Sequence, residues 1–493
     1  MSAQSLERCN AGHTRCGHRV MQETGGQLGE VVVSGGRLAK LGTRLGLDSR
    51  ERLSWALYDW ANSAFATTIM AAVLPVYYAS VAGAGLSGNT ASVYWGYTTA
   101  AGLLVIALVA PVLGSVADYV GAKKRFLAGF LTLGVVFTAA LFFTREGDWL
   151  LTSSLFVVAN VGFAGANIFY DSLLPHVTDE EGTDRLSAAG YALGYLGGGV
   201  LLVLNLAWIL SPSTFGISNN ASASRWAMLS VAVWWTVFSI PIFRYVDEPA
   251  PRNRTAEELE SNPSPIRAGF GQLRRTFSEV RQYRQLFVFL LAFWLYADGI
   301  GTIIKMATVY GATIGIGQQD LIGALVLVQF LGIPFAFAFG SLGDRIGAKR
   351  GIFIGLVVYA GVSVGGYFIS EAWHFWVLAA VVATVQGGTQ ALSRSLYSTL
   401  VPASKSSEFF SFFSISSKFA GIFGPLLFSV IGSVTGSSRL GIVSLLVFFV
   451  GGMVILWFVD VEEGRQAARD AQAAVDGDGA VSRTAAADGG SGT

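Results

Sequence analysis

The chain has 493 residues, of which 52% are hydrophobic and only 13% are charged, and its formal net charge is +1. A soluble domain carries roughly 25% charged residues, so this composition excludes an ordinary soluble protein. The low charge content is typical of a chain that faces lipid, where a buried charge is costly. The near-zero net charge gives no indication of a nucleic-acid partner, and we expect none.

Residues 1–53 are polar and are expected to form a disordered cytoplasmic N-terminus without a secretory signal. The chain's two cysteines lie there, and with two nearby histidines they offer four side chains of the kind that bind zinc. These are Cys9, His13, Cys16 and His18. Their spacing matches no standard structural zinc motif, so we expect neither a metal site nor a cofactor.

Twelve apolar runs follow, each near the ~20 residues that cross a bilayer as a helix. They cover 54–80, 92–116, 126–144, 149–174, 187–210, 226–243, 286–314, 320–342, 351–370, 374–400, 408–432 and 439–459. The runs are continuous rather than alternating, which excludes a transmembrane β-barrel. We therefore expect an N-terminal bundle over 54–245, a charged cytoplasmic linker over 246–285, a C-terminal bundle over 286–460 and a disordered cytoplasmic tail over 461–493.

The basic residues predict the orientation of the chain. They gather in the breaks after the second and eighth runs and in the central linker, and the breaks between them carry few. Since Lys and Arg favour the cytoplasmic side, we place both termini and the linker in the cytoplasm. The predicted location is a bacterial plasma membrane, with the lipid bilayer as surroundings.

One phrase occurs twice, as GSVADYVGAKKR over 114–125 and GSLGDRIGAKR over 340–350. The matched residues are Gly114 with Gly340, Asp118 with Asp344, Gly121 with Gly347 and Lys123 with Lys349. Two further echoes occur in the same order, between the first and seventh runs and between the fourth and tenth. The sequence thus predicts an all-α membrane protein of twelve transmembrane helices in two pseudo-symmetric six-helix bundles.

The repeated phrase permits two interpretations. Its glycines allow close helix packing and its acid suits the positive N-terminus of a neighbouring helix, which favours a hinged gating latch. Arg125 and Arg345 belong to the same basic clusters. The alternative is that these clusters only anchor the topology.

The spacing G-x-x-x-D-x-x-G-x-[KR] resembles the signature of the major facilitator superfamily, although Tyr119 stands where that family usually carries a basic residue. More narrowly, WALYDWANSAFATTI, FYDSLLPHV, AAGYALGYLGGG and SKFAGIFGPLLF look like the vacuolar amino-acid effluxer family linked to autophagy and its bacterial relatives. The resemblance covers residues 54–460. It implies a permease fold and amino acids as cargo.

Six ionisable residues lie inside the apolar runs and are candidates for function by default. They are Asp59, Asp171, Asp298, Lys305, Arg394 and Lys418, and the alternative is that they only pair with one another. Helical spacing aligns several with polar neighbours, which predicts a central cavity. The expected substrate or ion site comprises Asp59, Asn62, Asn167, Tyr195, Asp298, Lys305, Gln390 and Lys418, with helix packing as the alternative role for the tyrosine.

Two arrangements follow from these positions. Asp298 and Lys305 lie about 10 Å apart along one helix, too far to touch but suited to bracket a zwitterion with help from Lys418. Asp171 and Arg394 occupy equivalent places in the two halves and are expected to form a gate. In the fifth run, Gly190, Gly194 and Gly198 recur every four residues and predict close helix packing.

We expect a secondary transporter that moves an amino acid or another carboxylate-bearing compound by alternating access and acts as a monomer. Transport is either coupled to a proton through Asp59 or Asp298, or not coupled to an ion. The alternatives are a multidrug or sugar permease of the same fold and, more remotely, a membrane-embedded enzyme. No HExxH, GxSxG or CxxC pattern occurs in the apolar body, and no GxxxxGK[ST] loop occurs, so we expect neither an enzyme nor an ATP-driven pump.

Overall fold

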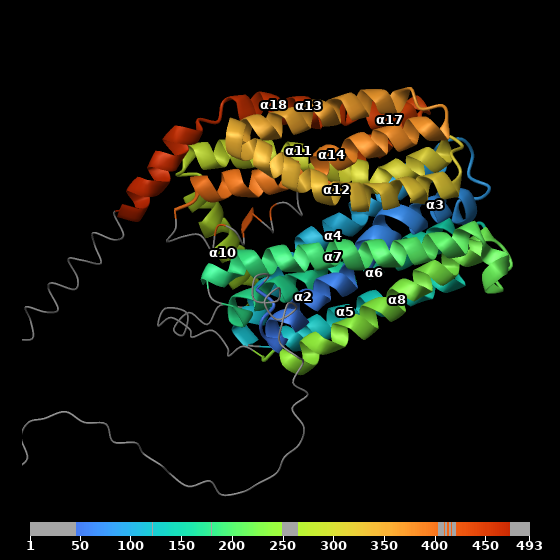
Figure 1. Cartoon of the computed structure of the whole chain (residues 1–493), viewed down its shortest axis with the longest axis horizontal. Helices are drawn as coiled ribbons and strands as arrows, with labels where there is room; N and C mark the ends of the chain where they lie inside the picture. Colours follow the sequence, from blue (N-terminus) through green and yellow to red (C-terminus); the bar gives the residue numbers. More distant parts are fainter. Residues whose placement is uncertain are drawn as a thin grey trace, which may run out of the picture.

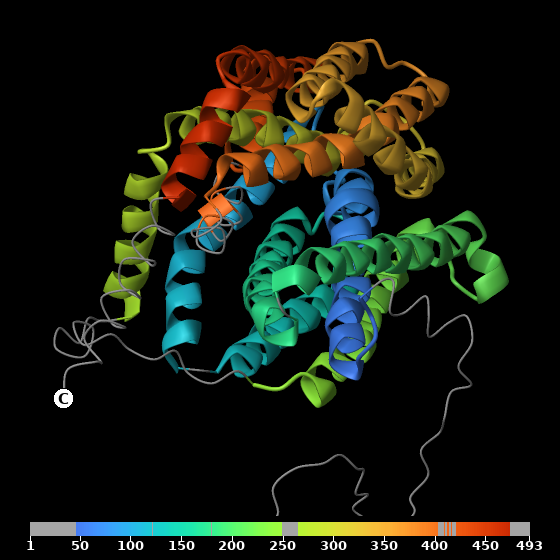
Figure 2. The same ribbon diagram turned by 60° about the vertical axis from the view of Figure 1, so that its left-hand side comes forward.

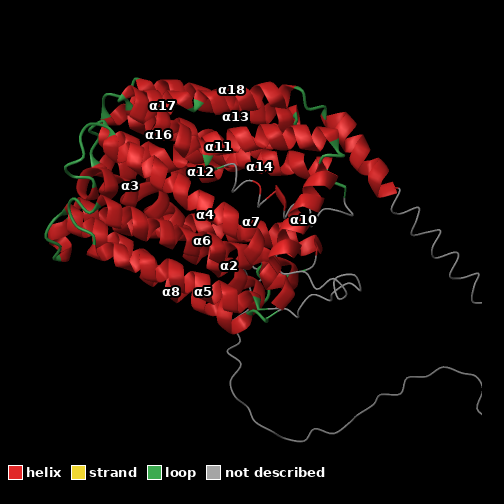
Figure 3. Ribbon diagram, turned by 180° about the vertical axis from the view of Figure 1, so that it is seen from behind, coloured by secondary structure: helices red, strands yellow, loops and turns green. Residues whose placement is uncertain are grey.

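The computed structural model describes residues 46–120, 122–178, 180–248, 265–402 and 421–473, together with 409, 412, 413 and 416. Throughout these residues the regular structure is helical, as Figure 3 shows. Eleven helical segments of this part are long and apolar enough to cross a membrane. The all-helical membrane fold expected from composition is confirmed.

The N-terminal half contributes six of these segments. They are a segment over Arg50–Ala82, α4 (Thr90–Val120), α5 (Lys123–Ala140), α6 (Trp149–Val177), α7 (Glu180–Leu210) and α8 (Asn220–Tyr245). The first begins at α2 (Arg50–Ala64), where the Ser49 hydroxyl accepts from the Arg52 N–H at 3.1 Å, an N-cap that satisfies one free donor of the first turn.

The C-terminal half lies alongside the first (Figure 1). It contains α11 (Arg284–Thr313), α12 (Gln318–Ile346), α13 (Ala348–Tyr367), α14 (Ala372–Leu400), α16 (Phe423–Thr435), α17 (Ser438–Ser444) and α18 (Leu446–Trp457). The run expected over 408–432 falls largely outside the described residues, and α16 is its described part. Figure 1 places α13 and α18 on the side of this half that faces away from the N-terminal half.

The two ends of the bundle differ and are called the linker end and the far end. The linker end is where α2 begins and where α10 (Pro265–Val280) packs beside α4 (Figure 2). The far end is the opposite one, where α7 and α11 finish. The chain after Asp460 departs from the expected disorder, because residues 461–473 are helical. Gln285 holds this helix by donating to Glu463 at 2.6 Å.

The first segment is wound more widely than an α-helix over η1 (Phe65–Ala72) and η2 (Tyr78–Ala82), which are π-helical. Pro75 lies between them and lacks the N–H that would reach the Ala71 carbonyl in an α-helix. The Thr308 hydroxyl of α11 donates to that carbonyl instead, at 2.6 Å. A side chain of the second half thus satisfies a backbone group of the first, as buried backbone requires.

The expected glycine stripe packs α7 against α2. A Cβ added to Gly190 would lie 2.6 Å from Asp59 Oδ2, and one on Gly194 would lie 2.6 Å from Ser63 Oγ. Gly198 meets Thr67 in the same way, at 2.9 Å. A methyl group at these positions would force the facing side chains to shift, so the stripe lets the first and fifth spans approach closely.

The repeated phrase holds neighbouring helices together within each half. Lys124 Nζ donates to the carbonyls of Phe243 and Val246 at the end of α8. Lys349 Nζ donates to those of Trp457 at 2.9 Å and Val459 at 2.7 Å, at the end of α18. Each lysine therefore caps the C-terminus of its half's sixth span, where a cation is favoured.

Among the described residues, six hydrogen bonds join the two halves toward the far end. They are Asn89 to the Gly432 carbonyl at 2.7 Å, Ser92 with Ser438 at 2.8 Å, Trp95 to the Lys305 carbonyl at 3.3 Å, Tyr97 with Ser433 at 3.4 Å, Thr308 to the Ala71 carbonyl at 2.6 Å and Gln318 to Ser224 at 2.7 Å. Because each couples one half to the other, the halves are closed against each other at this end.

Candidate functional site

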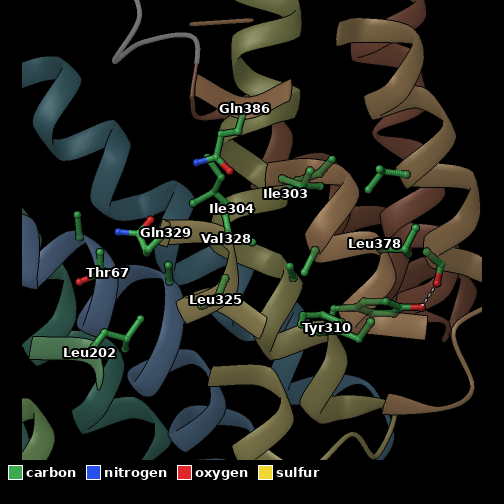
Figure 4. A pocket seen from close by; sticks show the side chains of 18 of the residues that line it. Thr67, Leu202, Ile303, Ile304, Tyr310, Leu325, Val328, Gln329, Leu378 and Gln386 are labelled. Atoms are coloured by element: carbon green, nitrogen blue, oxygen red, sulfur yellow. Dashed lines mark hydrogen bonds between the residues drawn. The ribbon is translucent and has the colours of Figure 1, made fainter. Parts of the chain in front are cut away.

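A cavity of about 260 Å³ lies between the two halves. α2, η1 and α7 form its wall on the N-terminal side, and α11, α12 and α14 form its wall on the C-terminal side. Figure 4 shows Thr67 and Leu202 on one flank and Tyr310 and Leu378 on the other. Ligand pockets in proteins span about 300–1,000 Å³, so this cavity suits a small solute.

The cavity is long, and the exposure of its lining residues falls from one end to the other. Its lining on α7 runs from Tyr191 to Leu202, which is about 16 Å along the helix axis at 1.5 Å per residue. Tyr191 is 51% exposed and Tyr195 37%, whereas Leu202 is fully buried. The cavity is therefore accessible from the linker end and sealed toward the far end.

Most of the lining is aliphatic, and the polar groups are neutral. They are the hydroxyls of Ser63, Thr67, Tyr191, Tyr195, Tyr310 and Ser363 and the amides of Gln329 and Gln386. Among the described lining residues none is charged. The wall can thus hold an apolar group and direct a few hydrogen bonds, and Tyr195 lies in it as expected.

Asp59 lies beside this cavity, one helical turn from Ser63, which does line it. The Tyr170 hydroxyl donates to its Oδ2 at 2.9 Å, and the Trp55 ring stacks on that tyrosine with centroids 4.5 Å apart. No described cation forms an ion pair with this carboxylate. Asn62 and Asn167, both expected at the site, contact each other: the Asn62 amide donates to Asn167 Oδ1 at 2.8 Å.

Asp298 is directed away from the cavity, toward the start of α16. Its Oδ2 accepts from the Gly424 N–H at 2.8 Å, and its Oδ1 accepts from the Thr302 hydroxyl at 3.4 Å. The side chain is 2% exposed. A carboxylate at a helix N-terminus satisfies free N–H groups and complements the helix dipole, so this arrangement stabilises the joint between α11 and α16.

Lys305 is half-buried, and its Nζ lies 3.6 Å from where a Cβ on Gly301 would stand. The side chain therefore folds back along α11. As the spacing predicted, it does not touch Asp298, and no described acid pairs with it. Neither residue is part of the described lining. Lys418, the third member of the expected zwitterion site, lies outside the described residues.

The contact across the halves at the linker end is made by Arg394 and Tyr191. Arg394 Nη2 donates to the Tyr191 hydroxyl at 3.0 Å, and its guanidinium lies 5.1 Å from the ring centroid. Asp171, the partner expected for Arg394, is exposed and is not the residue that Arg394 contacts. Gln390, one turn from Arg394, is exposed and lies outside the described lining, which instead includes Gln386.

The remaining candidates belong to the repeated phrase. Lys123 Nζ donates to the Ser172 carbonyl at 3.2 Å. Arg125 and Arg345 are exposed. Gly347 has a backbone φ of +89°, a conformation that favours glycine. Gly114, Asp118, Gly340 and Asp344 lie in α4 and α12, and the structure describes their backbone only; Gly121 and the four cysteine and histidine residues near the N-terminus lie outside the described residues.

Gln329 and Tyr310 were missed by the sequence reasoning. A signal was present for Gln329, because it is an isolated amide in the middle of an apolar run. Nothing in the sequence marks Tyr310 or Ser363, since hydroxyl-bearing residues are common throughout the spans.

Comparison with known proteins identifies the family. The model of the family described as "Vacuole effluxer Atg22 like" matches residues 48–469. The chain belongs to this Atg22-like family. An MFS-type transporter of Bacillus subtilis, YxiO, is 41% identical over 417 residues, covering 84% of this chain and 96% of YxiO. Autophagy-related protein 22 of Yarrowia lipolytica is 28% identical over 308 residues, covering 58% of this chain and 51% of that protein.

Solved structures agree on the fold. A D-xylose–proton symporter matches with a TM-score of 0.60 at 12% identity, covering 83% of this chain and 96% of that one. This Atg22-like protein is therefore an integral, multi-pass membrane transporter of the major facilitator superfamily and not an enzyme.

Proposed function

We propose that this Atg22-like transporter carries an amino acid or another small carboxylate-bearing solute, acting as a monomer in a bacterial plasma membrane with both termini in the cytoplasm. The two halves rock about the cavity between them, so that it opens to one side at a time. The observation that carries the proposal is this cavity, accessible past Tyr191 and Tyr195 and closed beyond Leu202.

Two features support a small solute over the alternatives. The cavity volume of about 260 Å³ lies below the usual range for drug-sized ligands, which disfavours a multidrug permease. The eight neutral polar side chains of the lining can bind a sugar, but its mostly aliphatic wall is better matched to a solute with an apolar side chain. That apolar lining is also what would favour a lipophilic drug, so the multidrug permease is the second candidate. The resemblance to vacuolar amino-acid effluxers favours a zwitterion, with Lys305 and Lys418 as candidate partners for its carboxylate.

Asp59 is our candidate for a coupling proton. Its carboxylate is half-buried beside the lining residue Ser63 and accepts from Tyr170. Asp298 is less suited, because both of its oxygens already accept hydrogen bonds. The gate at the linker end would comprise Arg394 with Tyr191, assisted by Asp171 and the repeated phrase.

A thermal-stability screen of the purified protein against amino acids, organic acids, sugars and cationic drugs tests the cargo class. A ligand at 100 times its Kd stabilises the folded state by about 2.7 kcal/mol. We expect a shift with amino acids that Lys305→Ala or Lys418→Ala weakens. A shift with cationic drugs alone would refute the carboxylate assignment, and normal amino-acid transport by both lysine variants would remove their assigned role.

A further inference from the structure

The cavity does not end at the interface between the halves but continues into the C-terminal half. Six lining residues on α11, α13, α14 and α17 surround this extension, which we name the side pocket. They are Tyr310, Ser363, Gly366, Phe375, Leu378 and Ile442. Figure 4 shows Tyr310 and Leu378 well apart from Thr67 and Leu202 of the N-terminal half. α13 lies on the side of its half that faces away from the N-terminal half, so the side pocket extends the cavity away from the interface.

The walls of the side pocket are apolar except at one residue. Phe375, Leu378 and Ile442 contribute hydrocarbon surface, and the Tyr310 hydroxyl is already used, because it donates to the Gly366 carbonyl at 2.6 Å. Ser363 is fully buried, and its Oγ has no hydrogen-bond partner among the described residues. The Tyr359 hydroxyl, one helical turn away, is also buried and has no partner in the described part of the chain.

Ten buried side-chain polar atoms lack a hydrogen-bond partner among the described residues, and of these ten Ser363 Oγ is the one whose residue lines the cavity. Hydroxyls on transmembrane helices commonly donate to the carbonyl four residues earlier, as Thr132 does to Ala128 at 2.8 Å and Thr138 to Gly134 at 2.6 Å. Ser363 makes no such bond to Tyr359. Buried polar groups without a partner are rare and call for a reason such as a bound ligand.

We infer that the side pocket is the specificity pocket of the transporter, which receives the apolar side chain of the solute, and that Ser363 binds a neutral hydrogen-bonding atom at the end of that side chain. The inference rests on the proposed transport of a small solute. The head of the solute stays at the interface, near Gln329 and Gln386. A solute whose hydrocarbon body ends in a hydroxyl, such as a phenol, matches this chemistry.

Phenol tests the pocket without any amino-acid head group. Both native cysteines, Cys9 and Cys16, lie outside the apolar body, so a Cys9→Ser, Cys16→Ser background accepts single cysteines. Phenol should slow maleimide labelling of Ser363→Cys severalfold. Gly361→Cys is the matched control on α13, because a Cβ there meets nothing within 4 Å, and its labelling should not change. Equal labelling of Ser363→Cys with and without phenol would overturn the inference, whatever the cargo is.

The second step isolates the hydroxyl in the otherwise native protein. Wild type should bind tyrosine more tightly than phenylalanine, and Ser363→Ala should reduce that preference by about 2- to 10-fold, the range of one neutral hydrogen bond. Ser363→Leu fills the pocket and should abolish binding of both while sparing alanine. An unchanged tyrosine preference in Ser363→Ala would refute the role of Ser363. Protection by phenol without binding of any amino acid would instead refute the proposed cargo and leave the pocket standing.

Discussion

Two carboxylates, half-buried Asp59 and buried Asp298, contact glycines on corresponding helices of the two halves. Asp59 faces Gly190 on the fifth span, and Asp298 faces Gly424 in α16, the described part of the eleventh run; added Cβ atoms would lie 2.6 and 2.7 Å from the two carboxylates. The partner helices differ. α7 is continuous past Gly190, so the helix uses that N–H itself, whereas α16 begins at Phe423 and leaves the Gly424 N–H for Asp298. Asp298 therefore caps a helix, whereas Asp59 does not.

Asp298→Ala should therefore destabilise the protein. Removing the carboxylate leaves the buried Gly424 N–H without its acceptor, which costs about 1–3 kcal/mol. Asp298→Asn keeps an acceptor oxygen and should retain most of that stability. Thermal unfolding of the detergent-purified variants distinguishes the two. An Asp298→Ala protein as stable as wild type would show that this bond does not stabilise the joint.

At this scale the sequence singled out individual residues but did not reveal what they contact. Asp298 stands out as an acid in an apolar run, yet its cap depends on where α16 begins, which no local pattern reveals. The repeated phrase pairs Lys123 with Lys349 by spacing. In the structure Lys124 is the equivalent of Lys349, because α5 begins at Lys123 and α13 at Ala348, one residue earlier in the phrase.

At the scale of the elements, the first and fifth spans pack closely against each other, and both line the cavity. Gly197 extends the stripe, since an added Cβ would lie 2.5 Å from the Trp60 carbonyl oxygen. Neighbouring residues of both helices, Ser63 and Tyr195, line the cavity. The separation of these helices therefore determines the shape of the cavity wall.

Gly197→Ala should lower the stability of this pair by about 1–3 kcal/mol, the usual cost of overpacking, because a backbone carbonyl rather than a flexible side chain must move. Gly361→Ala is the control: it adds the same methyl group where nothing lies within 4 Å, and alanine favours the helix by up to about 1 kcal/mol. Unfolding temperatures should fall for the first and hold or rise for the second. Equal behaviour would mean that α2 and α7 are not closely packed.

Long apolar runs predicted these elements well, because bilayer thickness fixes their length. The π-helical winding of the first span was not predicted. This winding accompanies Pro75, which is visible in the sequence. It also accompanies Thr308 of the other half, whose hydroxyl donates to the Ala71 carbonyl. Periodicity along one segment carries no information about such a distant donor.

Considered as a whole, the molecule has one closed end and one accessible end. Most of the described hydrogen bonds between the halves lie toward the far end, and the bond of Arg394 with Tyr191 lies toward the linker end. The exposed cavity residues Tyr191 and Tyr195 also lie toward the linker end. The duplication in the sequence predicted two halves. It did not predict this asymmetry, because the two states of the proposed alternating-access cycle share one sequence and differ in which contacts are made.

Alternating access requires the far end to part, so locking it should stop transport. Ser92 and Ser438 belong to different halves with hydroxyls 2.8 Å apart, close enough for a disulfide between cysteines at these positions. In the Cys9→Ser, Cys16→Ser background, oxidised Ser92→Cys, Ser438→Cys protein should lose transport in proteoliposomes and regain it on reduction. Thr98→Cys with Ser153→Cys, 2.9 Å apart within one half, should crosslink without that loss. Full transport by the crosslinked Ser92–Ser438 variant would show that the halves do not separate here.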